Sequence, residues 1–313
     1  MKKVLLTTSA LTLLAGAAAA DVSLGGYARI GVSNTGSTTS NYLRNQITFT
    51  GSATTDGGLT MSTWTRYRHS AASSKFAGTG AFAAPRISVS NGAMTLTAGN
   101  AGGAINANSG MWGCGAAMWG CADVVGSWDW ASTSSTGTGP NVVRLDMALG
   151  GASVSVSGGN GNDTEASLSM PIGGGSVGVG YDAGSATAAV AAVTAVQGVY
   201  NADGTVTQPV EAAAAVAAVA AQSTVSINWS GSMGGLGTGL RMSQSNGKTG
   251  YMGTITAPMG AGSVYVFAGK TLAASNNYGL RYNQSLGGGA SMQAGATSAG
   301  GVTTVGAGIA FGF

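Results

Sequence analysis

Hydrophobic and polar residues alternate along most of this chain, in short segments separated by glycine, asparagine, aspartate or proline. In 305–313, for example, Val305, Ile309 and Phe313 fall on one side of an extended chain, with glycine and alanine on the other. A period of two predicts β-strands with one apolar face. Sixteen such segments are expected, at 22–32, 42–53, 59–69, 84–90, 93–99, 141–149, 152–158, 163–170, 176–182, 223–231, 236–245, 248–257, 262–269, 276–286, 289–298 and 301–313.

The opposite face of several segments carries charge. Arg44 alternates with Leu43 and Ile47, and Arg144 and Asp146 alternate with valine, leucine and methionine. Only 7% of all residues are charged, against about 25% in an ordinary soluble domain. Beyond the first 20 residues no run of about 18 apolar residues could form a spanning helix. These features predict an all-β, transmembrane antiparallel barrel of 16 strands, with lipid outside and a polar lumen; a secreted glycine-rich β-solenoid is the alternative.

The connections agree with a barrel. If the first strand rises from the periplasm, every connection on the inner side is a short turn that contains glycine, asparagine or proline. The two long inserts, 100–140 and 183–222, both fall on the outer side. Short periplasmic turns and longer outer loops are typical of such barrels. The second insert is rich in alanine, and its part after Glu211 is expected to form a short helix.

The first 20 residues predict a secretory signal peptide, so the mature chain would be 21–313. Lys2 and Lys3 precede an apolar run, and small residues at 17–20 precede Asp21. Without these two lysines, 11 basic residues remain against 10 acidic ones, a net charge near +1. This balance gives no reason to expect a nucleic-acid partner.

Both ends of the mature chain also carry the residues of a known family. The first strand reads Asp21-Val22-Ser23-Leu24-Gly25-Gly26-Tyr27-Ala28-Arg29-Ile30-Gly31. The last strand reads Val305-Gly306-Ala307-Gly308-Ile309-Ala310-Phe311-Gly312-Phe313. On these residues the chain resembles an alphaproteobacterial (Rhodobacter-type) general-diffusion porin of the Gram-negative outer membrane; the middle of the chain matches only as a pattern.

The resemblance implies a homotrimer of sixteen-stranded barrels that binds outer-membrane lipid. It also implies that the outer loop after the fifth strand, here 100–140, folds into the lumen and narrows it. Related porins line this loop with several acidic residues, whereas this insert offers only Asp123 and Asp129. The cysteine pair and the alanine-rich insert are further departures from the family.

A basic wall is predicted on the lumen side of the first four strands. By parity its members are Arg29, Arg44, Arg66, Arg68 and Arg86. Facing Asp123 and Asp129, they would set a transverse field that favours polar solutes, since rings of charge confer ion selectivity. The alternative is that these arginines only keep the lumen wet and pair with scattered acids.

The insert 100–140 also contains both cysteines, Cys114 and Cys121, and four of the six tryptophans. Export permits oxidation, so a disulfide that rigidifies the loop is expected. A metal site is disfavoured because two thiols without a nearby histidine fall short of four ligands. The tryptophans either pack the loop onto the wall or line a path for sugar-like solutes.

No catalytic set is expected. Residues 174–178 read Gly-Gly-Ser-Val-Gly, but a nucleophile elbow needs a helix after the serine and a histidine later in the chain. The only histidine, His69, lies earlier. The sequence therefore predicts a channel for passive diffusion of small hydrophilic solutes and ions, with no enzymatic activity, cofactor or metal. The alternative is a non-conducting structural or adhesive barrel of the cell envelope.

Overall fold

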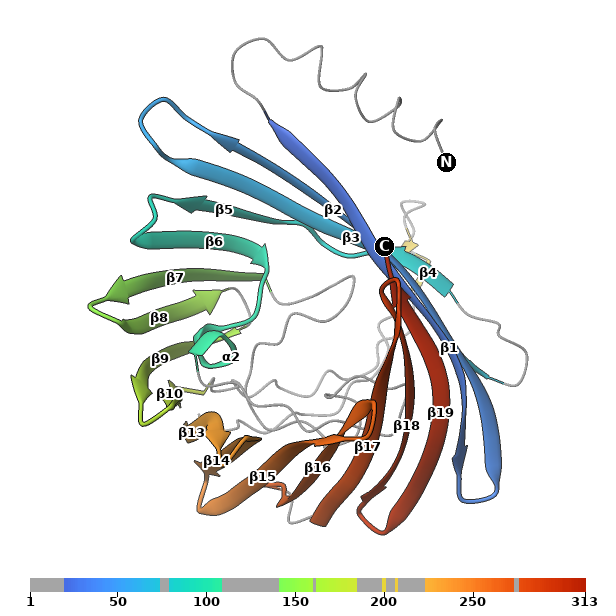
Figure 1. Cartoon of the computed structure of the whole chain (residues 1–313). Helices are drawn as coiled ribbons and strands as arrows, with labels where there is room; N and C mark the ends of the chain where they lie inside the picture. Colours follow the sequence, from blue (N-terminus) through green and yellow to red (C-terminus); the bar gives the residue numbers. More distant parts are fainter. Residues whose placement is uncertain are drawn as a thin grey trace.

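The computed structural model of the chain describes residues 20–73, 79–108, 141–159, 162–184, 199–200, 206–207, 223–272 and 276–313. Its antiparallel strands form one continuous sheet that closes on itself, because β1 pairs with both β2 and β19 (Figure 1). The strands of the barrel are β1 (Asp21–Thr35), β2 (Thr38–Thr54), β3 (Thr60–Ser73), β4 (Thr79–Phe82), β5 (Arg86–Ser90), β6 (Met94–Asn100), β7 (Asn141–Leu149), β8 (Ala152–Gly159), β9 (Asn162–Ile172), β10 (Gly175–Asp182), β13 (Thr224–Met233), β14 (Leu236–Ser245), β15 (Lys248–Met259), β16 (Gly262–Lys270), β17 (Asn276–Gly287), β18 (Ala290–Ala299) and β19 (Val302–Gly312).

The fourth position in the barrel is shared by β4 and β5, which both pair with β3. Between them the backbone N–H of Ala83 still donates to the carbonyl of Arg66 at 2.7 Å. Pro85 then interrupts the ladder, because proline has no N–H to donate. Counted as one, these two pieces complete a closed barrel of sixteen strands, so the predicted fold is confirmed.

Predicted and observed strand bounds agree closely. The segments 141–149 and 236–245 coincide with β7 and β14, and the other observed strands differ from the prediction mainly by a few residues at their ends. Within the insert 183–222, the short strands β11 (Val199–Tyr200) and β12 (Val206–Thr207) pair with each other, which the sequence did not predict. The helix expected after Glu211 lies outside the described residues.

The short connections have the backbone geometry of tight hairpins. Gly150 and Gly151, between β7 and β8, have φ values of 56° and 93°. Asn246 and Gly247, between β14 and β15, have φ values of 48° and 72°. Positive φ at both central residues is the mark of the turn whose twist matches that of the flanking strands. Glycine and asparagine at these positions therefore fix the strand register.

The two faces of the barrel have opposite chemistry. Large apolar side chains such as Leu24, Ile30 and Leu240 are exposed on the outer surface. Polar side chains occupy the alternate, inward positions; buried examples are Ser33, Gln46, Thr97, Ser155, Ser157, Glu165, Ser167, Asp182, Thr224, Ser226, Asn228 and Ser243. An apolar exterior and a polar interior are what a bilayer requires of a barrel. No helix among the described residues is long and apolar enough to span a membrane.

The described part of the chain contains one helix, the five-residue α2 (Ala104–Asn108). It follows β6 and lies inside the barrel, against β7, β8, β9 and β10 (Figure 1). Its first residues, Ala104 and Ile105, are buried. The start of the insert 100–140 thus turns inward, as the resemblance implied, and residues 109–140 lie outside the described part.

The seam of the barrel joins residues from opposite ends of the sequence. Tyr27 lies opposite Gly312 and Thr35 opposite Thr304 in the β1–β19 ladder. Gly26 and Phe313 extend it, because each N–H donates to the other's carbonyl, at 2.8 and 3.0 Å. A side chain at position 26 would collide with the backbone carbonyl of Gln46 on β2 and with the Phe313 ring. Glycine at this position therefore permits closure.

Candidate pore constriction

The five arginines predicted for the basic wall lie on one continuous part of the lumen face. Arg29 is directly opposite Arg44 across β1 and β2. On β3, Arg68 lies opposite Gln46 and Arg66 opposite Thr48 of β2. On β5, Arg86 lies opposite Trp64 of β3. Because directly opposite residues share a face of the sheet, all five side chains point into the lumen, as the parity of the sequence predicted.

The wall is built from arginine and aromatic rings together. Arg29 lies 4.9 Å from the centre of the Tyr42 ring, and its Nη2 donates to the Tyr42 hydroxyl at 2.6 Å. Arg86 lies 4.5 Å and Arg66 5.3 Å from the Trp64 ring. Cations over aromatic faces gain about 0.5–2 kcal/mol, depending on solvent exposure. These rings hold the guanidinium groups in place without neutralising the positive charge of the arginines.

The arginines step along the barrel in a regular way. Arg44 of β2 lies nearest the outer end of the strands. Arg68 and Arg66 of β3 and then Arg86 of β5 each lie two residues further toward the periplasmic end in the cross-strand register. Strand tilt and stagger accompany closure of a sheet into a barrel, so a belt around the lumen must change row from strand to strand. Arg66 lies within electrostatic range of Arg44, Arg68 and Arg86. The five side chains therefore act as one positively charged surface.

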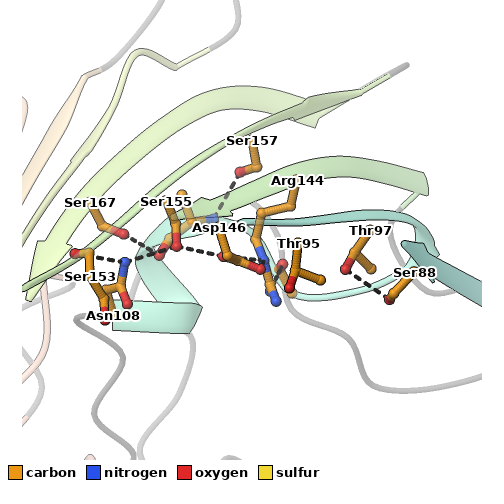
Figure 2. Close-up of polar contacts among 12 residues, drawn as sticks. Ser88, Thr95, Thr97, Asn108, Arg144, Asp146, Ser153, Ser155, Ser157 and Ser167 are labelled. Carbon is orange, nitrogen blue, oxygen red and sulfur yellow. Dashed lines mark hydrogen bonds and ion pairs between the residues drawn. The ribbon is translucent and has the colours of Figure 1, made fainter. Parts of the chain in front are cut away.

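A second part of the lumen wall, β7–β10, holds α2 through polar side chains of β8 and β9. The backbone N–H of Ala104 donates to Ser157 Oγ at 2.8 Å, and that of Ile105 to Glu165 Oε2 at 2.9 Å. At the other end of α2, Asn108 Nδ2 donates to Ser155 Oγ at 2.8 Å (Figure 2). The first N–H groups of a helix have no partner within it. Inward side chains of the strands supply the acceptors, which fixes the start of the insert against this wall.

Arg144 on β7 completes the attachment. Its Nη1 donates to the carbonyl of Gly102 at 2.6 Å, and its Nε lies 3.0 Å from the carboxylate of Asp146. The Ser155 hydroxyl links this pair to Asn108, since it also donates to Asp146 (Figure 2). Among the described residues this is the one ion pair. Charge on this wall is thus used to hold the chain.

Among the side chains that the structure describes, three inward acids lie on this side of the barrel: Asp146 on β7, Glu165 on β9 and Asp182 on β10. Glu165 and Asp182 are direct cross-strand neighbours, with exposures of only 0% and 3%. Asp182 accepts the N–H of Gly184 at 2.9 Å. From the sequence, the counter-charge was predicted on the loop, at Asp123 and Asp129; Asp146 was assigned to the polar face of its strand, but Glu165 and Asp182 were not predicted as lumen acids. The alternation of polar and apolar residues in their strands, which places these acids on the inward face, could have identified them.

The remaining predicted site residues, Asp123, Asp129, Cys114 and Cys121, lie outside the described residues. Their role opposite the basic wall stays a prediction. What the structure does bring together is the basic wall on β1–β5 and, on β7–β10, the polar wall that carries α2.

Comparison with known proteins agrees with this architecture. The sequence profile of the Gram-negative porin family matches residues 7–303. A triple mutant of the Rhodopseudomonas blastica porin superposes with a TM-score of 0.68 at 15% identity, covering 94% of this chain and 100% of that one. A second mutant of the same porin gives a TM-score of 0.68 at 16% identity with the same coverage. No curated protein matches the chain.

The predicted resemblance to Rhodobacter-type porins is therefore confirmed, and with it the outer-membrane location. At 15–16% identity, the solved structures establish the fold. The family match, which spans nearly the whole sequence, establishes membership of the family. The chain belongs to the Gram-negative porin family and is an outer-membrane porin.

Proposed function

We propose that this porin lets small hydrophilic solutes and ions diffuse passively across the outer membrane, selecting them by size and by the charge pattern at a constriction. The observation that carries this proposal is a closed barrel whose inward face is polar and whose outer insert begins inside the lumen, attached to one wall. Sixteen strands leave room for an aqueous channel, where eight would be filled by side chains. No chemical step is involved.

The constriction would lie between the basic wall and the insert 100–140. Arg29, Arg44, Arg66, Arg68 and Arg86 supply fixed positive charge from β1–β5, and Asp123 and Asp129 on the insert supply the opposing charge. Such an arrangement orients polar solutes and disfavours apolar ones, because a transverse field acts on dipoles. The attachment of α2 to Ser157 and Glu165 supports this proposal, since it places the start of the insert inside the lumen.

A disulfide between Cys114 and Cys121 would stiffen the insert. The bond would close a loop of eight residues, which is worth about 2.5 kcal/mol in chain entropy. The surrounding tryptophans would pack the loop onto the wall. A cross-linked insert would keep the width of the constriction constant during solute passage.

The chain would reach the outer membrane with residues 1–20 as a cleaved leader, and there would assemble as a homotrimer in lipid. The apolar outer face of the barrel supports contact with lipid and with neighbouring subunits. The proposed activity is transport alone, with no catalysis.

Single-channel recording in planar bilayers tests the proposal. Purified, refolded protein should insert with stepwise conductance, in groups of three steps if the trimer forms. A thiol reductant should increase the noise of the open channel, because it releases the cross-link in the insert. A refolded barrel that never conducts would contradict the proposal and favour a structural or adhesive role.

A further inference from the structure

Arg281, on β17, extends the basic wall across the seam of the barrel. It lies opposite Gly295 of β18, which lies opposite Gly306 of β19, which in turn lies opposite Ser33 of β1. The two strands between Arg281 and β1 thus carry no side chain in this row. Arg281 lies within electrostatic range of Arg29, so the positive surface continues from β5 through β1 to β17.

Both arginines of the seam are held from behind by rings. Arg29 lies over Tyr42 and donates to its hydroxyl, and Arg281 lies 5.7 Å from the centre of the Tyr265 ring. In the described part of the chain, the buried Nε of each has no hydrogen-bond acceptor. Neither forms an ion pair with a carboxylate there. In the described part of the chain, the charge of this pair is thus left available to a partner from the lumen side.

Guanidinium groups suit one class of compensating group. Their planar fork matches the oxygens of sulfate, phosphate and carboxylate, with which each can form two parallel hydrogen bonds. Two guanidiniums within range of each other also repel, and an anion with two charges relieves this repulsion better than an anion with one. Gly295 and Gly306 lie in the row that joins Arg281 to Ser33, and Gly31 separates Ser33 from Arg29 on the same face of β1. These glycines leave the wall beside the two arginines open to such an anion.

We propose that Arg29 and Arg281 form a binding site for divalent oxyanions on the lumen wall, over the glycine row of β18 and β19. The site rests on the proposed channel function and sharpens it, because it assigns the pore a preferred class of solute. Solutes with a paired negative charge, such as sulfate, hydrogen phosphate or a dicarboxylate, would dwell at the seam. Chloride would pass with little delay.

The test uses sulfate as the probe. Chloride current through single channels is measured while sulfate is added at constant ionic strength, in the wild type and in the variant Arg29→Gln/Arg281→Gln. The matched control, Lys248→Gln/Lys270→Gln, also removes two positive charges, but at the outer ends of β15 and β16. We expect sulfate to block the wild type and the control alike. The R29Q/R281Q variant should need at least tenfold more sulfate for the same block.

Two further measurements keep the outcome decisive. The variant R29K/R281K retains both positive charges but lacks the planar guanidinium groups. The sulfate concentration that it needs for block should lie between those of the wild type and R29Q/R281Q, which separates planar recognition from simple charge. Calorimetric titration of sulfate into the folded barrel in detergent requires no current, so a silent channel would contradict the porin proposal without deciding this one. Equal sulfate block in wild type and R29Q/R281Q, or equal or absent binding heat in both, would overturn the site.

Discussion

Two walls of the same lumen use arginine in different ways. On β7, Arg144 places its Nε against the carboxylate of Asp146 and gives its Nη1 to the carbonyl of Gly102. Asp146 neutralises its charge, and its Nη1 holds Gly102 at the start of the insert. Here arginine is a structural clamp.

On β1 and β5, Arg29 and Arg86 lie on the rings of Tyr42 and Trp64. A ring attracts the cation without neutralising it, so the side chain is held and its field still reaches the lumen. The comparison shows that arginine's effect on a pore depends on the group that holds it. Arginines stacked on rings contribute to the electrostatic potential in the lumen. An arginine paired with a carboxylate, such as Arg144, contributes by fixing the position of the backbone that it contacts.

The largest effect is expected where the polar wall is broken at its most buried contact. Glu165→Leu removes the acceptor of the Ile105 N–H at a position with 0% exposure. A buried donor left without a partner costs about 1–3 kcal/mol, more when a charged acceptor is lost. We expect α2 to detach, with higher and noisier conductance and new protease cleavage near residues 104–108 in the folded barrel.

Glu165→Gln is the matched control for this variant. It keeps an acceptor oxygen for the Ile105 N–H, so its channel should stay as quiet as the wild type. Quiet, protease-resistant E165L channels would show that α2 does not depend on this contact.

A smaller effect is expected where the basic wall loses a ring. Trp64→Leu removes the surface on which Arg66 and Arg86 lie, a loss of about 1–2 kcal/mol for the two contacts. Among the described residues, these side chains do not hold a chain segment in place, as Glu165 holds α2. We therefore expect anion preference, read from the reversal potential in a salt gradient, to fall severalfold while the thermal unfolding temperature barely changes. Trp64→Phe should retain most of the preference, and a W64L channel with unaltered reversal potential would contradict the role given to the ring.

The smallest effect is expected from Asp146→Asn. The ion pair with Arg144 is partly exposed, with side-chain exposures of 20% and 28%, and pairs of this kind contribute about 0–1 kcal/mol. Stability should hardly change, but Arg144 would lose its counter-charge and begin to act like the stacked arginines. The reversal potential should therefore shift toward anions, opposite to W64L. A shift toward cations would refute the distinction between the two walls.

Much of the fold could be predicted because a β-barrel requires little more of its sequence than alternating polar and apolar residues and tight turns. The parity that places Ile30 outside and Arg29 inside is local, and so are the glycine pairs at 150–151 and 234–235. The break at Pro85 was visible in principle, but the sequence does not show that Thr79–Phe82 continues the same strand on the other side of it.

The arrangement of the lumen was harder to predict. Parity shows that Arg281 and Glu165 point inward, but ladder register decides which residues they meet. That Arg281 faces Ser33 across two glycine positions, four residues along β1 from Arg29, depends on three strand pairings from opposite ends of the chain. That Glu165 accepts from Ile105 depends on where an irregular insert settles, 60 positions away. Local pattern carries no information on either contact.

The seam between β1 and β19 also dictates an order of events. Contacts such as Gly26 with Phe313 join residues separated by nearly the entire chain. Closing so large a loop costs roughly 3 kcal/mol more chain entropy than closing a ten-residue hairpin, and this ladder can form only once the last strand is present. Until then β1 and β19 expose open edges, which pair readily with other chains. Biogenesis must therefore keep the chain from pairing with others until all sixteen strands can close together.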